Sequence, residues 1–213
     1  VCAPQSPEVR DAVLRVDRSI ASLIEGVDRL GLRDRTNYVV VSDHGMAEVS
    51  TERLIVLDDY LDPSRVNVVD WSPVLGVNPK DGTVDELYAA LKDKHPHLAV
   101  YRNAEIPERY GLANHPRVPA VVGIADEGWF VTSRTERANW GRPDRGAPGG
   151  AHGYDPASPS MRGLFIAAGP RLRRGVVVPP FENIHLYELM CSLLGITPSP
   201  NDGSLRAIAG VLR

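Results

Sequence analysis

The sequence contains only two cysteines, Cys2 and Cys191, among its 213 residues. Two cysteines do not build a disulfide framework, and their separation does not match metal-ligand spacing. Cys191 lies in an expected amphipathic helix, where a buried cysteine acts as a small hydrophobic residue. The sequence therefore excludes a disulfide-stabilised or cysteine-ligated scaffold.

A strong charge excess and a long apolar run are also missing. The formal net charge is -3, and the basic residues are scattered apart from an ordinary turn at residues 171–174. No apolar stretch approaches the roughly 20 residues that span a bilayer. We therefore expect no nucleic-acid patch and no membrane span.

The sequence begins with Val1 and shows no signal peptide. Either processing has occurred or these residues belong to a longer polypeptide, and the motifs below favour the second. With 43% hydrophobic residues, the chain can bury a sizeable core.

The first segment has the pattern of a helix followed by a strand. Ser6 can cap the helix, Pro7 suits its first position, and apolar residues recur at three- and four-residue steps over residues 9–30. The β-branched and aromatic run at about residues 37–42 then predicts a strand buried on both faces of a parallel sheet covered by helices. This order predicts an α/β fold.

Short, proline-punctuated elements follow, and they predict a small inserted α+β lobe. The predicted organisation is two α/β core segments at residues 1–50 and 133–213, which carry the metal ligands, with the lobe at 51–132. Residues 133–151 predict an exposed mobile loop. In the lobe we expect a helix that starts at a capping box of Thr83 and Glu86 and runs to about residue 94. The further expected elements are strands at about 66–71, 98–101, 118–123, 129–132 and 163–168, and a helix over 183–194 capped by Asn183.

Two motifs carry candidate metal ligands. Asp43-His44-Gly45 follows the apolar run, and His152-Gly153-Tyr154-Asp155 follows a Gly/Pro-rich loop. Because α/β proteins place ligands at the carboxyl ends of strands, we expect Asp43, His44 and His152 to form one metal centre or parts of two. A capped strand end is the alternative for the Asp-His pair. Surface or capping roles are expected for His95, His97, His115 and His185, and only strand-edge roles for Thr36, Ser42 and Thr132.

Several stretches together extend this pattern over nearly the whole chain. They are Ser6-Pro7-Glu8-Val9, residues 40–46, His152-Gly153-Tyr154-Asp155, residues 161–170, 182–187, 194–196 and 201–203, and, in the lobe, 100–102 and 106–109. In this order and spacing they resemble the nucleotide pyrophosphatase/phosphodiesterase family of the alkaline phosphatase superfamily. The resemblance implies part of an alkaline-phosphatase-like sheet covered by helices, and a periplasmic or secreted enzyme.

The resemblance also implies site roles and a reaction. Asp43 and His44 would bind the metal ion that contacts the nucleophile, and His152 would bind the second metal ion. The implied enzyme hydrolyses small phosphodiester or nucleotide substrates through a covalent threonine or serine intermediate. Zinc is favoured by the mixed Asp/His ligand set, although manganese or iron fits the same residues.

The resemblance starts partway through the family pattern. In Gly-His-x-x-Gly-Pro-x-Ser-Pro-Glu, this sequence enters at the variable residues, so a ligand histidine would fall immediately before Val1. The nucleophile and the remaining ligands are then expected in a missing N-terminal part of the same polypeptide, and the chain alone is expected to be inactive. Two alternatives stay open: a phosphomonoesterase or mutase of the same superfamily, and a non-catalytic metal-binding or interaction fragment.

Overall fold

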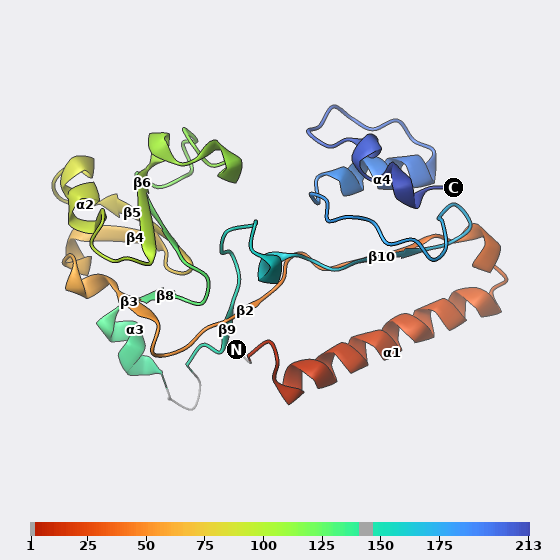
Figure 1. The fold of residues 1–213 in the computed structure, drawn as a ribbon, viewed down its shortest axis with the longest axis horizontal. Helices are drawn as coiled ribbons and strands as arrows, with labels where there is room; N and C mark the ends of the chain where they lie inside the picture. Colours follow the sequence, from red (N-terminus) through yellow and green to blue (C-terminus); the bar gives the residue numbers. More distant parts are fainter. Residues whose placement is uncertain (1–2, 141–146) are drawn as a thin grey trace. The chain divides into compact units, whose positions relative to one another are not determined.

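The computed structural model describes residues 3–140 and 147–213, which form two compact units (Figure 1). Unit 1 consists of the described residues of Val1–Ala12 and His44–Gly163, and unit 2 consists of Val13–Asp43 and Leu164–Arg213. The predicted lobe, residues 51–132, falls within unit 1. One boundary between the units separates Asp43 from His44.

Unit 1 is built on a four-stranded antiparallel sheet with the order β4-β5-β7-β6. Its buried face packs under α2, whose capping box between Thr83 and Glu86 is present as predicted. Two small sheets join it: β3 runs parallel to β8, and β2 runs antiparallel to β9. The bounds are β2 (Ala47–Glu48), β3 (Leu54–Val56), β4 (Val66–Asp70), β5 (Val74–Pro79), α2 (Val84–Leu91), β6 (Leu98–Arg102), β7 (Val121–Ala125), β8 (Phe130–Thr132) and β9 (Gly150–Ala151).

The predicted loop at residues 133–151 contains regular structure instead. The helix α3 (Arg134–Asn139) begins directly after Ser133, whose Oγ accepts a hydrogen bond from the N–H of Glu136 at 3.0 Å. This cap is a local signal that the arginine- and glycine-rich composition of the segment obscured. Residues 147–149 are irregular, as predicted, and residues 141–146, on which part of that prediction falls, lie outside the described residues.

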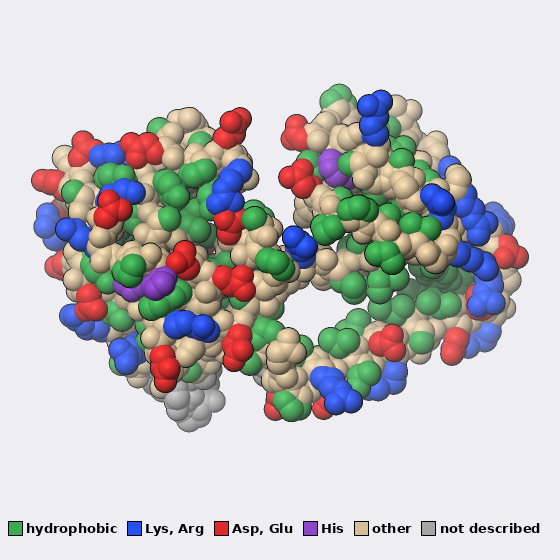
Figure 2. Space-filling view, in the orientation of Figure 1, with side chains coloured by type: hydrophobic (Ala, Val, Ile, Leu, Met, Phe, Trp, Pro, Cys, Tyr) green, Lys and Arg blue, Asp and Glu red, His purple; other side chains and the backbone are tan. Residues whose placement is uncertain are grey.

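The helix α1 (Pro7–Arg29) starts as predicted, with the N–H of Val9 donating to Ser6 Oγ at 3.3 Å. None of its residues is buried, and Val16 and Leu23 are 59% and 63% exposed. Figure 2 shows apolar side chains at the surface along this helix. The amphipathic pattern predicted the helix correctly, but its apolar face is open in this chain.

In unit 2, β1 (Tyr38–Val41) pairs antiparallel with β10 (Phe165–Ala168). The prediction that β1 is buried on both faces of a parallel sheet is therefore wrong for the described chain, because its one neighbouring strand is antiparallel and its side chains are partly exposed. Val41 and Ile166 are about half exposed, at 48% and 54%. The prediction failed because a run of β-branched residues is typical of a strand covered on both faces, whereas the described chain leaves these side chains half exposed.

The hydrophobic core of unit 2 lies between α4 (His185–Leu194) and the last residues of the chain. Leu189 packs there with Leu172, Ile208 and Val211, and Cys191 is buried as expected. The predicted cap at Asn183 is wrong, because Ile184 occupies the capping position and no side chain caps the helix.

Candidate metal centre

The structure brings together the two histidines of the sequence motifs. His152 directly follows β9, and His44 lies just before β2, with Ala47 opposite Ala151 in the ladder. Their imidazole rings stack with centroids 3.7 Å apart and planes 13° from parallel. Pairing of β2 with β9 thus places two nitrogen ligands from distant segments side by side.

A backbone carbonyl orients the ring of His44. Nδ1 of His44 lies 2.7 Å from the carbonyl oxygen of Gly45. The carbonyl only accepts, so the proton is on Nδ1 and the lone pair is on Nε2. Metal-binding histidines commonly use one ring nitrogen for such a bond and the other for the metal.

Gly45 is required here by a close backbone approach. Its N–H donates to the carbonyl of Met161 at 3.0 Å. A Cβ at this position would collide with the carbonyl oxygen of Ser160 and lie 2.8 Å from that of Arg162. Because the φ of Gly45 is not positive, the absence of a side chain is what makes glycine necessary here.

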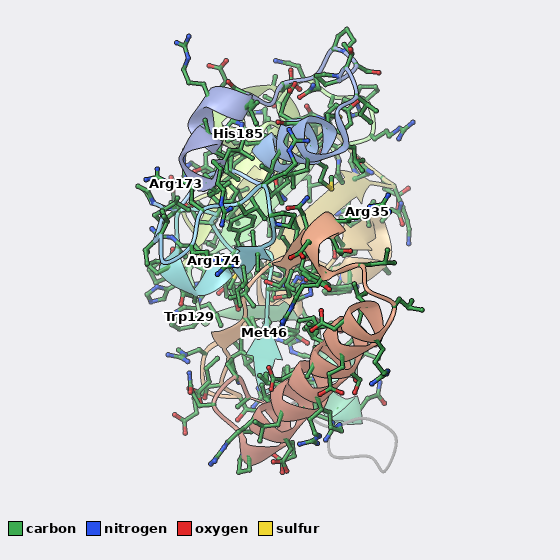
Figure 3. The ribbon with its side chains drawn as sticks, turned by 90° about the vertical axis from the view of Figure 1, so that its right-hand side faces the viewer. Arg35, Met46, Trp129, Arg173, Arg174 and His185 are labelled. Atoms are coloured by element: carbon green, nitrogen blue, oxygen red, sulfur yellow. The ribbon has the colours of Figure 1, made fainter. Side chains whose placement is uncertain are left out.

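Tyr154 anchors the residues that follow His152. The side chain is buried, and its hydroxyl donates to the carbonyl of Trp129 at 2.8 Å. Burial raises the pKa of Tyr154 to about 12. Tyr154 therefore has a packing role in this unit. Figure 3 labels its partner Trp129, and also Met46, the residue that follows Gly45 and precedes β2.

Asp155 forms a second anchor, toward the lobe. Nη1 and Nη2 of Arg109 donate to Oδ1 and Oδ2 of Asp155 at 2.7 and 2.6 Å, and the hydroxyl of Tyr110 donates at 3.2 Å. Hydrogen bonding to Arg109 lowers the pKa of Asp155 to about 2. Sequence reasoning assigned no role to Arg109; the only signal was that residues 106–109 match the family's lobe.

Asp43 directly precedes His44 and ends a segment of unit 2. Within the part of the chain that the structure describes, no three His, Cys, Asp or Glu side chains are grouped to hold a metal ion. The donor types nonetheless suit zinc, because imidazole and carboxylate are its common ligands beside thiolate. Metal binding by Asp43, His44 and His152 therefore remains a prediction.

The other four histidines use Nδ1 in local hydrogen bonds. His185 lies on α4 (Figure 3). The partners are the N–H of residue 97 for His95, the carboxylate of Asp126 for His97, the N–H of residue 117 for His115 and the N–H of residue 204 for His185. These contacts agree with the expected surface and capping roles.

The candidate hydroxyls at strand edges bond to nearby backbone. Thr36 Oγ1 donates to the carbonyl of Leu32, Ser42 Oγ accepts from the N–H of Leu164, and Thr132 is buried with its hydroxyl directed at the carbonyl of Ser133. Such bonds do not mark a nucleophile.

Comparison with known proteins places this chain among enzymes with an alkaline-phosphatase-like α/β fold. The solved structure of murine ectonucleotide pyrophosphatase/phosphodiesterase 5 matches 99% of the chain with a TM-score of 0.89 at 37% identity, and the match covers 54% of that protein. An inactive threonine-to-alanine variant of the same murine protein, solved in complex with AMP, matches with the same TM-score.

The sequence comparisons define the family. The profile of type I phosphodiesterase/nucleotide pyrophosphatase matches residues 2–155. Human ectonucleotide pyrophosphatase/phosphodiesterase family member 7 is 37% identical over 215 residues, which cover 98% of the chain and 45% of the relative. Mouse bis(5'-adenosyl)-triphosphatase is 36% identical over 203 residues, with 95% and 42% covered. The chain belongs to the type I phosphodiesterase/nucleotide pyrophosphatase family, and it spans less than half the length of these curated relatives.

Proposed function

We propose that this chain forms the C-terminal part of a metal-dependent phosphodiesterase or nucleotide pyrophosphatase. In this proposal Asp43, His44 and His152 contribute ligands to two divalent metal ions, with zinc favoured. The observation that carries it is the stacking of His44 on His152. Membership of the family supports the phosphoester chemistry.

The chain's own residues would position and orient the ligands. Two divalent ions, when bound, stabilise the attacking and leaving oxygens of an in-line displacement at phosphorus. The carbonyl of Gly45 keeps His44 in the tautomer with its lone pair on Nε2. β9 and the anchored residues 154–155 hold the backbone on both sides of His152.

We also propose that a threonine or serine nucleophile comes from an N-terminal part of the same polypeptide. The inactive threonine-to-alanine variant of the murine relative supports a catalytic threonine in the family. The same part would cover the open apolar face of α1 and the half-exposed strands β1 and β10. In agreement, the chain matches 45% of human family member 7 and 54% of the murine structure, so about half of each relative lies outside the match.

The proposed substrate is a small phosphodiester or a nucleotide. The AMP complex of the murine relative and the name of the mouse bis(5'-adenosyl)-triphosphatase support a nucleotide. A periplasmic or secreted location follows from the family resemblance, and relatives carry the name ectonucleotide pyrophosphatase/phosphodiesterase. Among the described helices, none combines the length and apolar character needed to cross a membrane.

Hydrolysis assays on the parent polypeptide test the proposal. A chromogenic phosphodiester should be hydrolysed, a chelator should abolish the activity, and zinc should restore it. His44→Ala and His152→Ala should each lose hydrolysis, and full activity of either variant would overturn the ligand assignment. Preference for the matching monoester would instead favour the phosphomonoesterase alternative. The isolated 213-residue chain should bind zinc weakly and show no turnover.

A further inference from the structure

The residue pair Arg109 and Asp155 links the lobe to the loop that carries His152. Arg109 lies in a 3-10 turn, Glu108–Tyr110, between β6 and β7. Asp155 comes three residues after His152. Nη1 of Arg109 donates to Oδ1 of Asp155, and Nη2 donates to Oδ2. A bidentate arginine–carboxylate pair restricts orientation as well as distance.

Arg109 is itself held in place by the lobe. Its guanidinium lies over the ring of Tyr110, 4.1 Å from the centroid. The ring packs against the buried cluster of Ile106, Val122 and Ile124. The position of Arg109 is thus tied to the four-stranded sheet through the aromatic side chain of Tyr110.

The residues after His152 are held at two anchors, Tyr154 and Asp155. Gly153, with φ of 94°, is the single residue between His152 and the anchors at Tyr154 and Asp155. Glycine can adopt many backbone conformations, so Gly153 does not by itself fix the direction of the chain at His152. The orientation of His152 therefore depends on what fixes the two residues that follow Gly153.

We propose that Arg109 is a positioning residue for the metal centre. Its ion pair with Asp155 fixes the loop so that the imidazole of His152 stays against His44 and ready to bind metal. This inference rests on the proposed function of His152 as a metal ligand. It gives the lobe a role in assembling the site, in addition to any contact that the lobe makes with substrate.

The test is a zinc titration of the full 213-residue chain, followed by NMR of the histidine ring signals. Zinc chloride is the probe, and the shifts of His44 and His152 report binding at each ring. Arg109→Gln should weaken zinc binding at the His152 ring by roughly tenfold or more, the usual effect of losing a group that orients a ligand. Asp155→Asn should do the same, and the double variant should be no weaker than either single variant.

Arg109→Lys is the variant that separates positioning from charge. Lysine keeps the positive charge but lacks the planar fork of the guanidinium. Zinc binding should therefore weaken in Arg109→Lys almost as much as in Arg109→Gln. This milder variant, with Asp155→Asn, also decides the question if Arg109→Gln fails to fold.

Arg102 provides a matched control in the same lobe. It bonds Asp85 through Nε and Nη2 at 3.0 and 2.8 Å, and its guanidinium lies 3.8 Å from the centroid of the Tyr88 ring. Its ion pair joins β6 to α2 instead of the loop after His152. Arg102→Gln should change thermal stability as much as Arg109→Gln but leave zinc binding unchanged.

The outcomes distinguish the inference from the function on which it rests. If neither His44→Ala nor His152→Ala weakens zinc binding by the chain, the proposed metal centre itself is wrong. If His152→Ala loses binding while the Arg109 and Asp155 variants retain it, only the positioning role is wrong. Equal weakening in Arg102→Gln would also overturn the positioning role, since it would reflect general loss of stability.

Discussion

The imidazole rings of His44 and His152 lie face to face with their centroids 3.7 Å apart. This contact depends on the backbone on both sides. The pairing of β2 with β9 sets the register, and the approach of residues 160–162 to Gly45 fixes the turn that precedes β2. Changes remote from the ring nitrogens should therefore disturb the histidine pair.

Gly45→Ala should destabilise unit 1 by roughly 1–3 kcal/mol, the range for overpacking a tight site. The added Cβ meets the carbonyl of Ser160, and the backbone must shift to admit it. Urea unfolding measures the loss. Gly26→Ala is the control, since its Cβ meets only the end of Arg29 at 3.8 Å. In a helix this change should be neutral or stabilising by about 0.5–1 kcal/mol; similar losses in both variants would contradict the explanation.

Stability should depend on Asp155 in acid. Its folded pKa of about 2 lies below the unfolded value, so the stabilisation is complete above about pH 5 and is lost as the pH falls toward 2. Both side chains are partly exposed, so about 1 kcal/mol is expected. The difference in unfolding free energy between the wild type and Asp155→Asn should shrink between pH 5 and pH 3. A constant difference would mean that the ion pair contributes nothing.

Tyr154 should give the opposite dependence in base. Its folded pKa of about 12 lies above the unfolded value, so its stabilisation is present below about pH 10 and is lost as the pH rises further. Tyr154→Phe also removes the bond to the Trp129 carbonyl, which should cost about 1 kcal/mol at neutral pH. Urea unfolding at pH 7–11 checks both effects, because the wild type should approach the variant as the pH rises.

Local signals explain which features the sequence predicted. The capping box at Thr83 depends on residues close in the sequence and is found as expected. The two histidine motifs can likewise be identified from neighbouring residues, whereas the stacking of their rings depends on the pairing of β2 with β9. β5 went unpredicted because Gly76 and Pro79 weaken its strand pattern. Its place between β4 and β7 overrides that local preference.

Long-range partners could not be predicted from the sequence. Nothing in the local sequence around Arg109 names Asp155 as its partner, 46 residues further on. The apolar run of β1 predicts a strand covered on both faces, because such a pattern indicates the environment of a strand and not the identity of its neighbours. In this chain that environment is incomplete, because β10 is its one partner among the described strands.

Because the apolar face of α1 is open in this chain, replacing apolar residues there should change stability little. Val16→Ser and Leu23→Ser remove side chains that are mostly exposed, so each should change the unfolding free energy by less than about 0.5 kcal/mol. Leu189→Ala is the contrast, because Leu189 is fully buried and its loss should cost about 2–5 kcal/mol. Urea unfolding of the 213-residue chain measures all three.

The same serine variants then test whether an N-terminal part covers α1. In the parent polypeptide, burial of this face would raise the cost of Val16→Ser and Leu23→Ser by about 1–3 kcal/mol each, the value of burying such a side chain. The surface variant Arg18→Ser on the same helix should stay near zero in both settings. Equal costs in the chain and in the parent would contradict docking on this face.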